Sequence, residues 1–151
     1  MEELYAEVSR VAAERMDAVQ LSAFRGETPR EQIAAFLRAH MRAMKRRPGD
    51  AVYRSRSIDA GVSAAVAGIW EASRQRAIDK MFQTLGLDKP SPRHRVCLRA
   101  WIAFHDRLVA GWLADHTLTE REVLQWSLSQ LDHLAHDVLG VDLLCPLPAE
   151  A

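Results

Sequence analysis

The stretch from Leu98 to Leu113 constrains the fold more than any other part of the sequence, because it carries two apolar stripes at helical spacing. Side chains three and four positions apart share one face of a helix, so both stripes predict a helix here. A helix on the surface of a globular protein needs only one such stripe. We therefore expect this helix either to run through the middle of a bundle, or to bury one stripe in its own domain and the other against a second copy. The first stripe is Cys97, Trp101, Phe104, Leu108 and Trp112, and the second is Leu98, Ile102, Val109 and Leu113.

The segment after this helix predicts a partner helix from Thr119 to Gly140. Thr119 and Glu122 have the spacing of a capping box, and Gly140 is suited to a left-handed C-terminal cap. Only a short connection separates the two helices, so we expect an antiparallel hairpin. Both helices carry surplus apolar surface, which makes the hairpin a candidate dimer interface. Its predicted contact residues are Trp112, Val123, Leu124, Leu128, Leu131 and Ala135.

The remainder of the chain also reads as helix, without strand-like alternation. The first helix has an expected apolar face of Leu4, Val8, Val11, Ala12, Arg15 and Val19. A second begins at Thr28 and has a face of Ile33, Phe36, Leu37, His40, Met41 and Met44. A short third helix is expected near 50–57 and a fourth over 59–85. The sequence thus predicts an all-α fold, an antiparallel bundle of about six helices over residues 1–144, with an irregular tail over 145–151.

Length, charge and hydropathy limit the classes of function that this chain can have. The 151 residues suffice for one domain, and 20 basic side chains balance 20 acidic ones. A net charge of zero gives no electrostatic reason to expect nucleic-acid binding by the domain as a whole. No apolar run has the length of a membrane span, and the acidic start at Glu2 and Glu3 is unlike a secretory signal. We expect a cytoplasmic protein that binds neither a membrane nor a cofactor.

From Glu2 to about Gly140, the sequence resembles the tetracycline-repressor (TetR) family of transcriptional regulators, and two parts of it carry the resemblance. The run Leu98-Arg99-Ala100-Trp101-x-x-Phe104, continuing to Trp112-Leu113 and Thr119-x-x-Glu122-Val123-Leu124, is similar to the last two helices of that family. The opening Glu2-Glu3-Leu4-Tyr5-x-x-Val8 is similar to the entry into its long connecting helix. The resemblance implies a homodimeric effector-binding domain that would contact DNA only through an N-terminal helix-turn-helix domain, which this sequence lacks. It also implies an allosteric mechanism, in which the bound effector tilts the first helix.

The resemblance further implies that a small, mostly apolar effector binds among the middle helices. These helices carry large and partly polar side chains, a mixture that suits such a ligand. The residues are Phe36, His40, Met44, Tyr53, Trp70, Trp101 and His105. The alternative for each of them is a place in the apolar core without a ligand.

Three local patterns suggest other functions, and each has a simpler interpretation. Ala60-Gly61-Val62-Ser63 matches the turn of a helix-turn-helix unit, but the helix after it is too apolar to read DNA, so we expect an ordinary helix start. His133 and His136 lie on adjacent turns, where a nearby helix end explains them better than a metal does. Cys97 follows His94 by one turn but has apolar neighbours, which favours a packing role over a reactive thiol.

The sequence shows no catalytic motif, and we expect neither a catalytic site nor a metal site. Two alternatives to the regulatory domain stay open. One is a free-standing helical dimer that acts through protein–protein contacts without an effector. The other is a bundle enzyme or metal protein, which would require metal in the purified sample and a role for His133 or His136.

Overall fold

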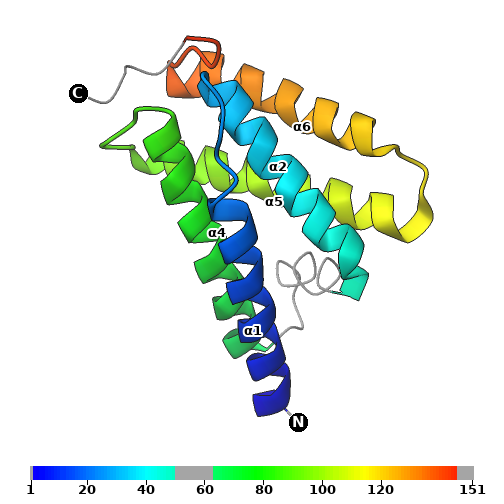
Figure 1. The fold of residues 1–151 in the computed structure, drawn as a ribbon. Helices are drawn as coiled ribbons and strands as arrows, with labels where there is room; N and C mark the ends of the chain where they lie inside the picture. Colours follow the sequence, from blue (N-terminus) through cyan, green and yellow to red (C-terminus); the bar gives the residue numbers. More distant parts are fainter. Residues whose placement is uncertain (1, 50–62, 146–151) are drawn as a thin grey trace.

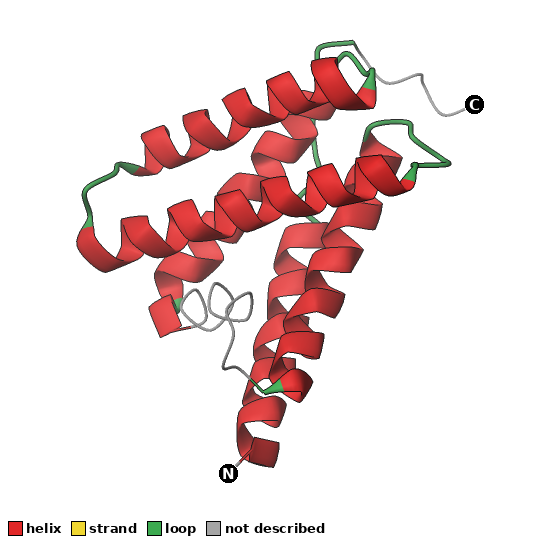
Figure 2. Cartoon of the chain, turned by 180° about the vertical axis from the view of Figure 1, so that it is seen from behind, coloured by secondary structure: helices red, strands yellow, loops and turns green. Residues whose placement is uncertain are grey.

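In the computed structural model, which describes residues 2–49 and 63–145, all regular structure is helical (Figures 1 and 2). Five α-helices and one short π-helix are described: α1 (Glu2–Leu21), α2 (Pro29–Arg46), α4 (Ala64–Thr84), α5 (Pro92–Asp115), α6 (Glu120–Leu134) and η1 (Ala135–Leu139). The all-α prediction is confirmed, and the expected helix near 50–57 lies outside the described residues. Within the described part, none of the helices is both long and apolar enough to cross a membrane.

The helices form two pairs joined by α2. Helices α1 and α4 lie side by side with their N-terminal ends at the same end of the molecule, and α5 and α6 form an antiparallel hairpin (Figure 1). Helix α2 contacts α1, α4, α5 and α6, and therefore connects the two pairs. The side chains at the junction of α1, α2, α4 and α5 are consequently enclosed by four helices.

Side-chain hydrogen bonds define the helix starts. Capping boxes begin α2 at Thr28, α5 at Ser91 and α6 at Thr119. In the last of these, Glu122 N donates to Thr119 Oγ1 at 3.2 Å and Thr119 N donates to Glu122 Oε2 at 2.7 Å, as the sequence predicted. Ser63 caps α4 by accepting from Val66 N at 3.4 Å, so α4 begins later than the predicted residue 59.

We expect the Thr119 cap to make stability depend on pH. The hydroxyl and backbone N–H of Thr119 donate to the Glu122 carboxylate and lower its pKa. A carboxylate with a lowered pKa stabilises the fold above the ordinary glutamate pKa, and this contribution is lost as pH falls through the lowered pKa. The variant Glu122→Gln should therefore melt about 2 °C below the wild type at neutral pH and converge with it in acid.

Melting curves recorded by circular dichroism from neutral to acid pH measure this effect. The neighbouring variant Glu120→Gln is the matched control, because Glu120 lies in the same first turn but faces Lys45 Nζ at 3.8 Å. A constant difference between Glu122→Gln and the wild type at all pH values would contradict the assignment.

The buried face of α1 differs from the sequence prediction. Leu4, Val8, Val11 and Val19 are exposed, whereas Ser9, Ala12, Ala13, Met16, Asp17 and Gln20 are buried. Small residues and hydrogen-bonding side chains, rather than branched apolar ones, therefore pack α1 against its neighbours. The predicted face of α2, in contrast, is confirmed, because all six of its residues are buried.

Helix α5 buries one broad face against its own chain. Leu98, Ile102 and Val109 of the second stripe are buried, and so are Trp101 and Trp112 of the first. Phe104 remains 38% exposed. The two stripes thus merge into one broad buried face, with only part of the first stripe directed outward.

The residues predicted for a dimer interface lie inside the protomer. Trp112, Val123, Leu128, Leu131 and Ala135 are buried, and Leu124 is partly buried against the same apolar clusters. The reason is that α6 packs with these side chains on α5 and α2. They are core residues of the protomer, so the opposite face of the hairpin would have to supply any contact with a second copy.

Candidate functional site

Six buried polar side chains gather where α1, α2, α4 and α5 meet. We call this set the polar cluster: Asp17, Gln20, His40, Ser73, Arg74 and Asp106. Placing charged groups away from water is costly unless they are paired and hydrogen-bonded. The contacts of each member therefore decide what the cluster can do.

One half of the polar cluster is an ion pair between α4 and α5. Arg74 Nε donates to Asp106 Oδ2 at 3.1 Å, and both side chains are almost fully buried. On the other side of the same carboxylate, Asp106 Oδ1 lies 3.6 Å from His40 Nε2 on α2. The Asp106 carboxylate is thus held between a guanidinium and an imidazole.

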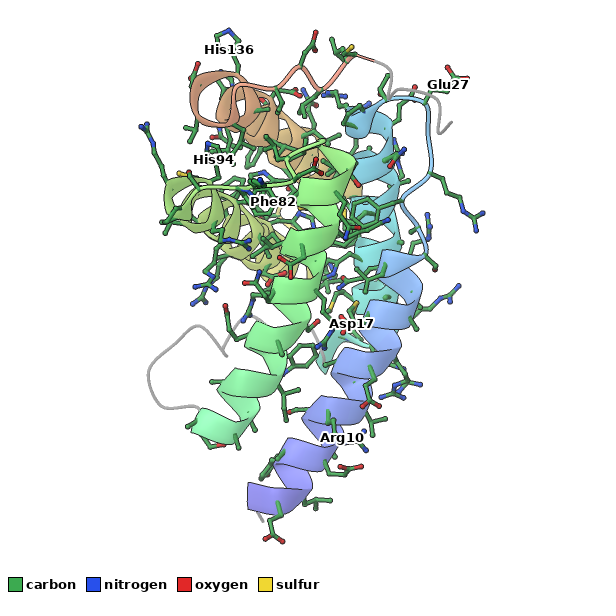
Figure 3. All side chains as sticks on the ribbon, turned by 90° about the vertical axis from the view of Figure 1, so that its left-hand side faces the viewer. Arg10, Asp17, Glu27, Phe82, His94 and His136 are labelled. Atoms are coloured by element: carbon green, nitrogen blue, oxygen red, sulfur yellow. The ribbon has the colours of Figure 1, made fainter. Side chains whose placement is uncertain are left out.

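The other half runs from α2 to α1 and α4. Gln20 Nε2 donates to Asp17 Oδ1 at 3.2 Å, which turns Gln20 Oε1 toward His40 Nδ1, also at 3.2 Å. Because that oxygen can only accept, the proton of this bond is on His40 Nδ1. Asp17 also accepts from Ser73 Oγ and from Arg76 Nε, each at 2.6 Å. Asp17, labelled in Figure 3, therefore links α1 to α4.

Aromatic side chains flank the polar cluster. Ring centroids are 6.5 Å apart for Phe36 and His40, 5.2 Å for His40 and His105, and 6.3 Å for His105 and Trp101. Trp101 Nε1 donates to the backbone oxygen of Ser127 at 2.8 Å, which fixes the indole. The structure thus brings together four of the predicted ligand residues, Phe36, His40, His105 and Trp101.

The other predicted ligand residues lie elsewhere. Trp70 packs with Ala12, Ala13 and Val66 between α1 and α4. Met44 belongs to an apolar cluster with Met16, Met41, Val109, Trp112 and Val123. Tyr53 lies outside the described residues.

Ser127 and His105 do not form an activated nucleophile. Ser127 Oγ lies 2.8 Å from His105 Nδ1 and donates its own proton to Val123 O at 2.8 Å. While that proton goes to the backbone, the hydroxyl can only accept from the imidazole. A catalytic base would need the reverse direction of this bond.

The histidines considered for metal binding are used locally. His133 Nδ1 lies 2.7 Å from Ser129 O, and His136 Nδ1 lies 2.7 Å from Asp137 Oδ1 at the outer end of the molecule (Figure 3). His94 Nδ1 accepts from Ser91 N in the α5 capping box, at 3.4 Å, and so serves the helix end. Across residues 2–49 and 63–145, His, Cys, Asp and Glu side chains form no group of three that could hold a metal ion.

Most of the polar cluster was not predicted from the sequence, although part of its signal was present. Asp106 follows Ile102 by four positions and precedes Val109 by three, so it occupies the second apolar stripe. Arg74 likewise follows Trp70 by four positions on the buried face of α4. A charged residue in register with an apolar stripe is the pattern that predicts a buried ion pair.

Compared with protein-family models, curated proteins and solved structures, the chain matches none. The function proposed for this chain therefore depends on the geometry of the polar cluster and its aromatic neighbours.

Proposed function

We propose that this domain binds a small, mostly apolar molecule beside the polar cluster, and that it is the regulatory domain of a TetR-like transcriptional regulator. The observation that carries this proposal is the placement of Arg74, Asp106 and His40 in the interior of the domain, beside buried aromatic rings. Replacing a buried ion pair by apolar residues of similar volume often leaves the stability of a fold unchanged or raises it. Ligand sites, in contrast, combine apolar walls with a few buried polar groups.

The neighbouring aromatic rings define the chemistry of the proposed ligand. Phe36 and Trp101 offer apolar ring surface, and the imidazoles of His40 and His105 lie between these two rings and add polar edges. A ligand with an apolar body and one hydrogen-bonding group matches this arrangement.

The polar cluster also offers a route from the ligand to α1. His40 contacts Gln20 of α1, and Asp17 of α1 contacts Ser73 of α4. A ligand that moves the His40 ring would favour one position of α1 over another, which is a population shift. In TetR-like regulators this helix leads to the DNA-binding domain, so a shift of α1 would change DNA binding by such a domain.

The proposal includes a homodimer formed by the outward face of the α5–α6 hairpin. Phe104 and Trp126 are 38% and 45% exposed on these helices. Exposed aromatic residues are frequent anchors of protein–protein interfaces. The same residues support the alternative function, a helical dimer that acts by protein contacts without an effector.

A ligand screen separates these two functions. At a concentration of about 100 times its Kd, a ligand should stabilise the fold by about 2.7 kcal/mol, which raises the melting temperature by roughly 5–10 °C. Thermal shift and tryptophan fluorescence with a library of hydrophobic small molecules measure both effects. The variant His40→Gln should weaken binding about ten-fold or more, since it removes one ligand contact.

The matched control is His133→Gln, because His133 is exposed on α6 and its Nδ1 lies 2.7 Å from Ser129 O of the same helix. Equal affinity of the wild type and His40→Gln for the same compound would place the site elsewhere. A library without any stabilising compound would favour the helical dimer that acts without an effector.

A further inference from the structure

The surface between α1 and α2 forms an apolar groove with arginine side chains along its length. One hollow of about 390 Å³ lies between the middle of α1 and the C-terminal half of α2. A second hollow of about 380 Å³ shares Val19, Ala39 and Arg42 with the first, so the two are continuous. We call the surface of both hollows the arginine groove. Its apolar floor includes Ala12, Met16, Val19, Ala39 and Ala43.

Every charged side chain that the structure describes in the lining of this groove is an arginine. The six are Arg15, Arg25, Arg38, Arg42, Arg46 and Arg47. Within residues 2–49 and 63–145, none of them forms an ion pair with a carboxylate, whereas Arg10, Arg30, Arg76 and Arg95 on other surfaces all do. The groove therefore carries a local excess of positive charge in a chain whose net charge is zero.

The acidic side chains of α1 beside the groove do not neutralise it. Glu7 and Glu14 both pair with Arg10 of their own helix. Asp17 pairs with Arg76 of α4. The carboxylates that complement the groove must therefore come from another molecule.

Helix stability accounts for only part of this charge. Cations in the last turn of a helix interact favourably with its dipole, which explains Arg46 and Arg47 at the C-terminal end of α2. The effect is confined to that turn, and Arg38 and Arg42 lie in earlier turns. Arg15 Nε donates to the backbone oxygen of Val11 at 3.2 Å, which leaves its charge without a counter-ion among the described residues. The excess charge is thus a property of the surface and not of one helix end.

The distribution of the arginines limits the class of partner. The groove follows one face of α2 from Ala35 to Arg47, a rise of about 18 Å. Arg38 lies toward one end of this face and Arg46 toward the other. An acyl anion carries its charge at one end only, and a nucleic acid has phosphates along its length but no continuous apolar face for the floor. An amphipathic helix with carboxylates beside its apolar stripe supplies both features over three turns.

We propose that the arginine groove binds an acidic amphipathic helix of a partner protein. The apolar stripe of the partner helix lies on the floor of the groove, and its flanking carboxylates meet Arg15 on the α1 side and Arg42 and Arg46 on the α2 side. Guanidinium and carboxylate groups form strong, often bidentate hydrogen bonds. About 12 residues of helix have the length of the groove. The groove contains no member of the polar cluster, so this inference does not rest on the proposed function.

A designed peptide tests this inference. It has about 14 residues and a fluorescein label, with leucine at alternating spacings of three and four residues, glutamate on both sides of this stripe, and alanine and glutamine on the opposite face. Fluorescence anisotropy should show saturable binding that weakens as the salt concentration rises. A peptide of the same composition in scrambled order keeps the charge but loses the stripe, and it should bind at least about ten-fold more weakly.

Reversing charge in the groove tests the role of the arginines. The variant Arg42→Glu/Arg46→Glu should bind the peptide at least about ten-fold more weakly than the wild type, because like charges then face each other. Both side chains are exposed, so the helix content measured by circular dichroism should stay the same. The matched control is Lys89→Glu/Arg93→Glu, which makes the same charge change at exposed positions between α4 and α5 and should bind like the wild type.

A substitution in the floor tests the apolar contact separately. Val19 is 48% exposed in the groove, and Val19→Ser should lower the affinity about five-fold, since less apolar surface is then buried by the peptide. Val96→Ser is the matched control, because Val96 is 66% exposed on α5, away from the groove.

The proposal is overturned if the ordered peptide does not bind, if the scrambled peptide binds equally well, or if Arg42→Glu/Arg46→Glu binds like the wild type. Dodecanoate and a short DNA duplex test the other two classes of partner. Displacement of the labelled peptide by either of them, at a lower concentration than the unlabelled peptide requires, would assign the groove to an acyl anion or to a nucleic acid and overturn the proposal as well.

Discussion

Replacing Asp106 by leucine should lower the free energy of unfolding by about 3–5 kcal/mol, because the Arg74 guanidinium then loses its buried counter-charge. Arg74 Nε and Asp106 Oδ2 are 3.1 Å apart, and 2–3% of each side chain is exposed. Urea unfolding followed by circular dichroism measures the change through linear extrapolation. The double variant Arg74→Met/Asp106→Leu should recover most of the loss, since an apolar pair needs no counter-charge.

Helices α4 and α5 also carry an exposed ion pair, which serves as a matched control for the Arg74–Asp106 pair. Arg95 of α5 and Asp79 of α4 are 3.3 Å apart, but their side chains are 48% and 52% exposed. Water and salt screen such a pair, so Asp79→Leu should cost about 1 kcal/mol or less. Equal losses for Asp106→Leu and Asp79→Leu would contradict the buried position of the Arg74–Asp106 pair.

Local features of this fold could be predicted from the sequence because their atoms lie within four residues of each other. The Thr119 capping box joins residues three apart, and Gly140 ends the last helix with a φ of 66°. The last turn before Gly140 is a π-helix, which the sequence pattern did not indicate. The buried face of α2 could also be predicted, because the apolar residues of this helix form a single continuous stripe.

The orientation of α1 could not be predicted in this way. Its sequence contains two possible faces, one with Leu4, Val8 and Val11 and another with Ala13, Met16 and Asp17. Which face is buried depends on the side chains that α4 and α2 present to it. Ser73 and Arg76 of α4 both contact Asp17, and this match selects the more polar face.

The polar cluster was hidden from sequence analysis by the separation of its members. Ser73 and Asp17 are 56 positions apart, and Arg74 and Asp106 are 32 apart. No spacing rule relates such residues before the helix pairing is known. His40 and His105 were identified because imidazoles stand out in apolar helices, whereas Asp106 lies in register with an apolar stripe and its partner Arg74 is 32 positions away.

Replacing Leu128 by glutamate should unfold the domain or lower its free energy of unfolding by more than about 3 kcal/mol. Leu128 is buried in the main apolar cluster between α2, α5 and α6. A carboxyl group at this position would either lose its charge or admit water into that cluster. A position at a dimer interface, where the sequence analysis expects Leu128, would instead give a folded monomer on the same substitution.

The exposed position Trp126 on the same helix provides the comparison. Trp126→Glu should keep wild-type helix content and near-wild-type stability, since its side chain is 45% exposed. If the outward face of the hairpin forms the proposed dimer, this variant should also reduce the dimer population in size-exclusion chromatography with light scattering. Circular dichroism and urea unfolding of both variants measure the contrast. A Leu128→Glu protein that is folded, as stable as the wild type and merely monomeric would mean that the core face and the interface face of α6 are exchanged.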